Sequence, residues 1–69
     1  DLADRAYAQV ERLTGPTADF LNNRGYSYML RGDLRRASTD LSRAAALDPT
    51  NERIHNNLRA LETRARGTR

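Results

Sequence analysis

The stretch that decides the fold is ADFLNNRGYSYMLRGDLRRASTDLSRAAALDPTN, which covers residues 18–51. Near its end, Ala37, Leu41, Ala44 and Leu47 follow one another at steps of four, three and three. Small and apolar residues at these steps lie on one face of a helix. Nearer its start, Leu21, Gly25 and Tyr28 show the same spacing. The stretch therefore predicts two amphipathic helices.

Working outward, the same spacing and the turn residues predict four helices, near residues 2–13, 17–31, 34–47 and 51–65. Gly32 is expected to end the second helix and Asp33 to cap the third. Pro49 disfavours helix at the residue before it, so the third helix should end there, and Thr50 or Asn51 can cap the fourth. On the third helix, the residues expected to face away from the packing are Asp40, Ser42 and Arg43.

The chain also repeats itself at an offset of 34 residues. The offset aligns Ala3 with Ala37, Val10 with Ala44, Phe20 with Ile54, and the pair Asn22-Asn23 with Asn56-Asn57. A fixed period of this length is typical of helical repeat proteins. The register divides the chain into half a repeat (1–17), a whole repeat (18–51), half a repeat (52–66) and a tail (67–69).

This pattern resembles the tetratricopeptide repeat (TPR), a helix-turn-helix unit of 34 residues. The resemblance implies an all-α solenoid of about four antiparallel helices. Three positions depart from the family pattern. Leu21 replaces the usual Trp, Arg24 stands where a buried Leu is common, and Arg59 stands where Gly or Ala is usual. Arg59 suggests that the last helix has no close partner on that side.

The run from Asn22 to Tyr28, together with Leu47-Asp48-Pro49 and Asn56-Asn57-Leu58, also resembles the TPR lipoprotein of bacterial tight-adherence (Tad) pilus assembly. TPR arrays usually hold a peptide or a partner protein on their concave surface. The resemblance thus implies a non-catalytic interaction module, a scaffold or assembly factor of a bacterial complex such as pilus or secretion machinery, in the cytoplasm or periplasm.

The residues predicted to contact such a partner lie on the first helix of each repeat: Asn22, Asn23, Tyr26, Met29, Arg53, Asn56 and Asn57. In TPR peptide clamps, an Asn at the position of Asn23 and a basic residue at that of Arg53 hold the ligand. An amide can donate to and accept from a peptide backbone, and an Arg fork fits a carboxylate. The alternatives are surface amides for Asn23 and Asn57, and helix packing for Tyr26, Met29 and Leu30.

Enzyme and cofactor chemistry finds no support among these residues. The chain has no Cys, no glycine-rich phosphate loop, no paired acids, and serines without a neighbouring base. A lone His55 does not make a metal site, and its alignment with Leu21 predicts a packing role. The longest apolar run has four residues, against the ~20 of a membrane helix, so we expect a soluble protein.

Composition leaves two further hypotheses open. The 69 residues carry 12 Arg and no Lys, with a net charge of +3, and the excess lies in residues 52–69. An Arg-rich helix could bind nucleic acid, although no stacking aromatic accompanies these arginines. The second hypothesis is self-association, because each end of the chain is predicted to present a helix that lacks its repeat partner. Since the chain starts at Asp1, we also expect it to be a piece of a longer protein.

Overall fold

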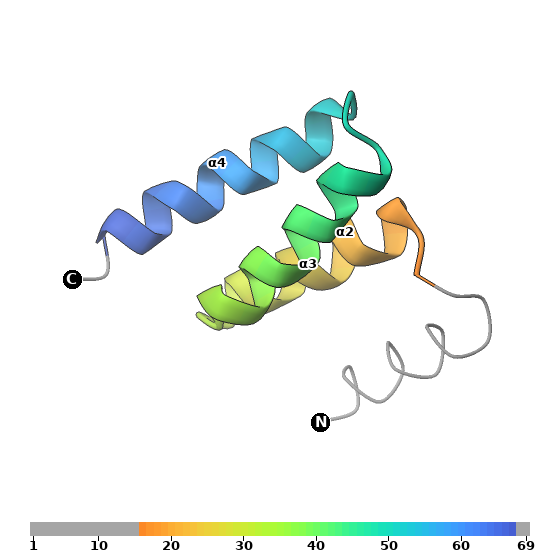
Figure 1. Cartoon of the computed structure of the whole chain (residues 1–69). Coiled ribbons are helices and arrows are strands. Elements are labelled where there is room, and N and C mark those ends of the chain that lie inside the picture. The colour runs from red at the N-terminus through yellow and green to blue at the C-terminus, as the bar shows by residue number, and fades with distance from the viewer. Residues whose placement is uncertain (1–15, 68–69) are drawn as a thin grey trace.

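The computed structural model describes residues 16–67, and Figure 1 shows its three helices. They are α2 (Ala18–Leu30), α3 (Leu34–Leu47) and α4 (Glu52–Gly67). The helices predicted over residues 17–31, 34–47 and 51–65 are thus present, with ends that differ by at most two residues. The helix predicted over residues 2–13 lies outside the described residues. The described part of the chain is all-α, with three helices.

Local turn chemistry explains where α2 begins and ends. The hydroxyl of Thr17 caps α2 by accepting from the Phe20 N–H at 3.1 Å. At the other end Gly32 has φ +82°, its N–H donates to the Met29 carbonyl, and the next N–H donates to the Tyr28 carbonyl. These two bonds form a Schellman motif, which satisfies the last carbonyls of α2.

Polar side chains also cap the N-termini of the two following helices. A carboxylate oxygen of Asp33 accepts from the Arg36 N–H at 3.2 Å and caps α3. The side-chain oxygen of Asn51 accepts from the Arg53 N–H at 2.9 Å, which makes Asn51 the cap of α4. Asp48 is the C-cap of α3. The helix therefore ends directly before Pro49, as the proline predicts. Short turns therefore force each helix back along the previous one.

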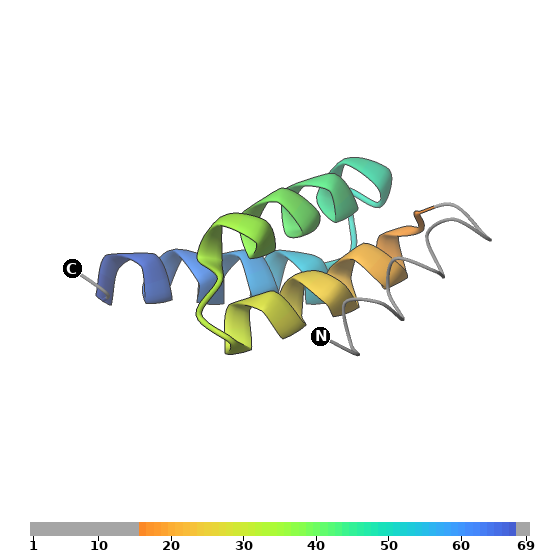
Figure 2. The ribbon, with the colours of Figure 1, turned by 90° about the horizontal axis from the view of Figure 1, so that it is seen from below.

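The helices lie in two layers. Figure 2 shows α3 in one layer, with α2 and α4 running in the same general direction in the other. One core cluster, at the end of the molecule that contains the α2–α3 turn, comprises Met29, Ala37, Leu41 and Leu61. The second, towards the α3–α4 turn, comprises Leu21, Ala44 and Ile54. All three described helices contribute to both clusters, and α4 supplies one buried residue to each, Leu61 to the first and Ile54 to the second.

The crossing of α2 and α3 is close because Gly25 has no side chain. A Cβ at Gly25 would lie 2.8 Å from the Leu41 Cγ and 3.2 Å from the Asp40 Cβ. Ala37, the other small residue expected at the crossing, is fully buried. The close approach predicted at Gly25 is thus confirmed, and Ala37 is buried.

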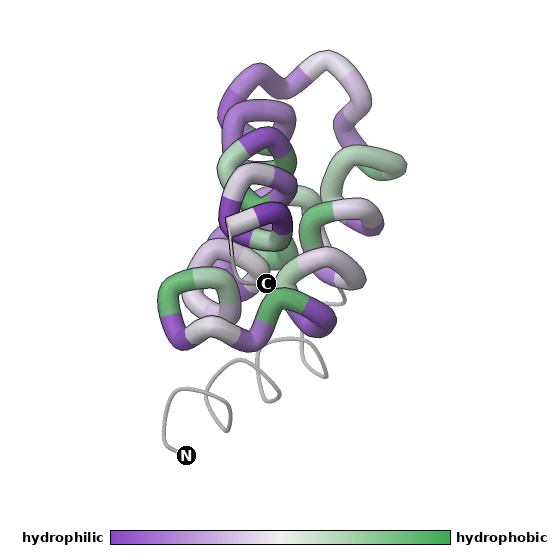
Figure 3. Tube along the Cα trace, turned by 90° about the vertical axis from the view of Figure 1, so that its left-hand side faces the viewer, coloured by the Kyte–Doolittle hydropathy of each residue, from purple (hydrophilic) through white to green (hydrophobic). Residues whose placement is uncertain are grey.

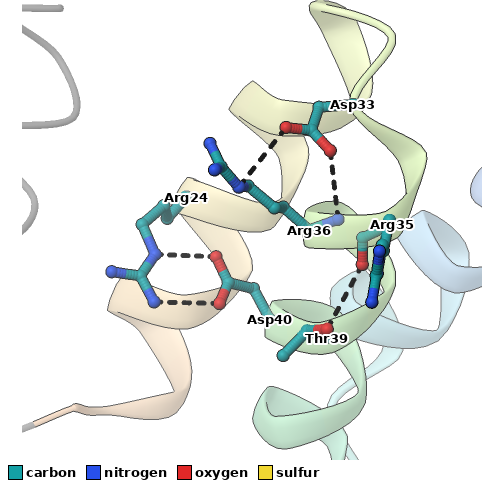
Figure 4. Close-up of polar contacts among 6 residues, drawn as sticks. All are labelled: Arg24, Asp33, Arg35, Arg36, Thr39 and Asp40. Carbon is teal, nitrogen blue, oxygen red and sulfur yellow. Dashed lines mark hydrogen bonds and ion pairs between the residues drawn. The ribbon is translucent and has the colours of Figure 1, made fainter.

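Two predictions about the faces of α3 were wrong. Asp40, expected to face away from the packing, is only 3% exposed. Figure 4 shows why: its carboxylate accepts two hydrogen bonds from the Arg24 guanidinium of α2, from Nε at 2.7 Å and from Nη2 at 2.9 Å. This bidentate pair explains the arginine at a position where a buried Leu is common. Leu47, expected on the packing face, is 58% exposed because α3 ends there, beyond the second cluster.

Candidate functional site

A groove of about 360 Å³ lies where α2 and α4 meet. Six residues line it, three from each helix: Asn22, Asn23, Tyr26, Arg53, Asn56 and Asn57. All six were predicted to contact a partner, and the structure brings them together around one concavity. Whether they bind a partner stays a prediction.

A hydrogen bond between two amides links the α2 and α4 walls of the groove. The Asn57 Nδ2 donates to the Asn22 Oδ1 at 2.8 Å, across 35 residues of sequence. Both side chains are half-buried. The bond leaves the Asn22 Nδ2 as a donor and the Asn57 Oδ1 as an acceptor. It also holds α2 and α4 at a set separation, so the groove exists before any ligand arrives.

The walls of the groove offer mainly hydrogen-bond donors. The Asn56 Oδ1 accepts one hydrogen bond from the Arg59 guanidinium, which uses one of its two acceptor positions and leaves its N–H groups to donate. Arg53 adds a guanidinium cation, and none of the described residues that line the groove is acidic. Asn23 is exposed, and its amide can both donate and accept. A ligand rich in carbonyl or carboxylate oxygens matches this set.

An apolar strip continues the α2 wall. Tyr26 is 45% exposed and Leu30, one helical turn further on, is 55% exposed. The alternative prediction, that both side chains pack against a neighbouring helix, is wrong because neither is buried. The groove therefore combines amides, one cation and an exposed aromatic ring.

Met29 does not belong to this site. It is 1% exposed and packs with Ala37, Leu41 and Leu61 in the first core cluster. Its position on α2 turns it towards α3 and α4 and away from the groove. The prediction of Met29 as a partner contact was wrong, and its packing alternative holds.

His55 takes neither a ligating nor a core position. Its ring Nε2 donates to the Pro49 carbonyl, which can only accept, and the side chain is half-buried. Leu21, its equivalent in the repeat register, is fully buried instead. Over residues 16–67 no group of three or more His, Cys, Asp or Glu side chains is placed to hold a metal ion. None of the helices in that range is long and apolar enough to cross a membrane.

Sequence reasoning missed a second hollow, of about 260 Å³, lined by Pro16, Arg43, Ala46 and Leu47. It was missed because Leu47 was assigned to the packing face of α3. The Asn22–Asn57 bond was missed as well, but the sequence did carry a signal for it. The 34-residue register aligns Asn22-Asn23 with Asn56-Asn57, and equivalent residues on parallel neighbouring helices lie close together.

Stacked antiparallel helices, a 34-residue register and a groove between equivalent helices are typical of a helical repeat. Comparison with protein families agrees: residues 25–58, from the middle of α2 to the middle of α4, match the TPR repeat. The chain thus contains a TPR repeat, which implies a protein–protein interaction module of a typically non-catalytic kind. No comparison supports the finer resemblance to the Tad pilus lipoprotein. Neither the curated proteins nor the solved structures give a significant match.

Proposed function

We propose that this protein binds an extended peptide segment of a partner protein in the groove between α2 and α4. The observation that carries the proposal is the preformed groove, with amides on both walls and Arg53 at one end. An extended peptide exposes carbonyl and N–H groups along its length, and side-chain amides can pair with both. The exposed ring of Tyr26 would supply apolar contact.

The size of the groove suggests a short epitope. From Asn22 to Leu30, the α2 wall and the apolar strip that continues it rise by eight helical steps, or about 12 Å at 1.5 Å per residue. An extended peptide rises about 3.3 Å per residue, so about four ligand residues would lie in the groove. So small an interface should give modest, transient binding.

The test is a display library of short peptides, selected against the protein and measured by fluorescence anisotropy. The double variant Asn23→Ala/Arg53→Ala removes one groove side chain from each helix. Neither side chain is used by the fold, because Asn23 is exposed and Arg53 takes part in the cap of α4 through its backbone N–H. We expect affinity to fall at least about tenfold.

The matched control is Ser42→Ala/Arg43→Ala. It changes the same number of exposed side chains and removes one positive charge, but from α3, outside the groove. The control should bind the selected peptides as the unmodified protein does. Equal affinity of the groove variant and the control would refute the groove as the binding site.

As the setting for this binding, we propose a scaffold or assembly role in a bacterial complex such as pilus or secretion machinery. Support comes from the TPR repeat and from the resemblance of the Asn22–Tyr28 run to the Tad pilus lipoprotein. Pulldown with the unmodified protein and the groove variant, followed by mass spectrometry, tests it. We expect the unmodified protein to recover a pilus or secretion component that the groove variant does not recover. If the unmodified protein recovers no such component, this setting is wrong.

A further inference from the structure

The described charges are distributed unevenly along the molecule. Leu34 at the start of α3 and Leu61 in the second half of α4 contact the same core cluster, so the α2–α3 turn and the last turns of α4 share one end of the molecule. Figure 3 looks onto this end, where hydrophilic stretches dominate the last turns of α4. We call it the basic end. Its arginines are Arg31, Arg35, Arg36, Arg64 and Arg66.

The basic end carries the whole net charge of the described chain. Its five arginines face two acids, Asp33 and Glu62, which leaves a net charge of +3. Over the rest of residues 16–67, four arginines balance four acids. The potential at this end is therefore positive.

The local contacts leave much of this charge available to a partner. Asp33 pairs with Arg36 at 3.6 Å and Glu62 with Arg66 at 3.2 Å, both between exposed side chains that water screens. The guanidinium of Arg31 lies 4.8 Å from the centre of the Tyr28 ring, and that of Arg36 lies 5.8 Å from it. Arg35 and Arg64, both exposed, form no ion pair with any residue of the described chain.

The groove leads to the basic end. On α2, Tyr26 and then Leu30 continue the wall that begins at Asn22, at helical steps of four. On α4, the face that carries Asn57 continues through Ala60 to Arg64. A segment lying in the groove and extending past Leu30 would meet Arg64 and the arginines of the α2–α3 turn.

We propose that the partner of this protein is an acidic segment: a peptide whose groove-bound core is followed, on one side, by aspartates or glutamates that the basic end binds. The proposal rests on the function proposed above and specifies its ligand. Charge complementarity favours it, because arginines flank one end of the groove and the described residues along its walls include no acid. The exposed Leu30 between groove and arginines adds an apolar contact at the junction.

The experiment compares three peptide libraries that share a randomised core of about four residues. In two of them a glutamate block precedes or follows the core, and in the third glutamine replaces glutamate. We expect one of the two glutamate libraries to bind about five- to tenfold more tightly than the glutamine library at low salt. The preference should shrink at about 0.5 M NaCl, where surface charges are screened.

Variants locate the preference. Arg35→Gln and Arg64→Gln should each reduce it, and the double variant should abolish it while leaving the glutamine library unaffected. Arg43→Gln, which removes the same charge from α3 towards its other end, should retain it. A preference that survives Arg35→Gln/Arg64→Gln, or that Arg43→Gln weakens equally, would overturn the proposal.

Two further outcomes separate the proposals. If the glutamine library binds in a manner that depends on Asn23 and Arg53, and the glutamate libraries bind no better, the groove stands and the acidic ligand is refuted. If Asn23→Ala/Arg53→Ala leaves the binding of the glutamate libraries unchanged, both the groove as the binding site and a ligand that spans groove and basic end are refuted. A single-stranded DNA oligonucleotide that binds more tightly than the glutamate libraries, with steep salt dependence, would replace the acidic peptide with nucleic acid.

Discussion

Gly25 illustrates how one missing side chain sets the distance between two helices. We predict that Gly25→Ala lowers the free energy of unfolding by about 1–3 kcal/mol, because the new Cβ would lie 2.8 Å from the Leu41 Cγ. The better helix propensity of Ala, worth up to about 1 kcal/mol, only partly offsets the clash. Urea unfolding followed by circular dichroism measures the change. Gly67→Ala is the matched control, because nothing lies within 4 Å of its Cβ, and it should cost nothing.

The Arg24–Asp40 pair makes the second prediction at the scale of residues. Its side chains are only 12% and 4% exposed, so removing one partner strands a buried charge. We expect Arg24→Met to cost about 3–5 kcal/mol of unfolding free energy, and Arg24→Met/Asp40→Leu to recover most of it. A double-mutant cycle in urea gives the coupling energy. The control is Arg36→Met, which breaks an exposed ion pair and should cost under about 1 kcal/mol. Equal losses of unfolding free energy in Arg24→Met and Arg36→Met would contradict this account.

These residues also show what the sequence could and could not predict. Gly25 was predictable because a glycine on an apolar helix face has few explanations other than close packing. Burial of Asp40 was not, since it depends on a guanidinium from another helix, 16 residues earlier. Likewise Asn22 and Asn57 were predicted as separate contacts of a partner. Only the arrangement of α2 beside α4 turns them into a bonded pair.

At the scale of elements, the turn between α2 and α3 depends on Gly32. Its φ of +82° is strained for a residue with a Cβ, although no atom lies within 4 Å of the position. We therefore predict that Gly32→Ala lowers the unfolding free energy by about 1–2 kcal/mol from backbone strain alone. Gly32→Asn should cost less, because Asn tolerates this conformation better. Equal costs in thermal unfolding would rule out strain as the cause.

The helix boundaries were the most predictable part of the fold. Gly32-Asp33 and Asp48-Pro49 encode their turns through chemistry that acts within a few residues, so sequence alone places them. Exposure at the ends of helices was less predictable. Leu47 fits the apolar period of α3, but the core ends at Ala44. Met29 fits the exposed side of α2, but Leu61 of α4 covers it. Both outcomes depend on how far the neighbouring helix extends.

At the scale of the whole molecule, Leu58 connects the two ends, because it packs against both core clusters. We therefore expect the described helices to unfold as one cooperative unit. Ile54→Ala, in the cluster towards the α3–α4 turn, should cost about 2–4 kcal/mol. Native-state hydrogen exchange by NMR should then show the same loss of protection around Leu61, in the other cluster, as around residue 54.

Ile54→Val is the matched control and should cost about 0.5–1.5 kcal/mol, again spread evenly between the two ends. Loss of protection confined to the vicinity of residue 54 would mean that the clusters unfold separately. That distinction bears on binding, because the groove takes one wall from α2 and the other from α4. If α4 could detach while α2 and α3 stayed folded, the Asn22–Asn57 bond would break and the groove would open. A cooperative core keeps both walls in place, and the ligand then meets donors that are already positioned.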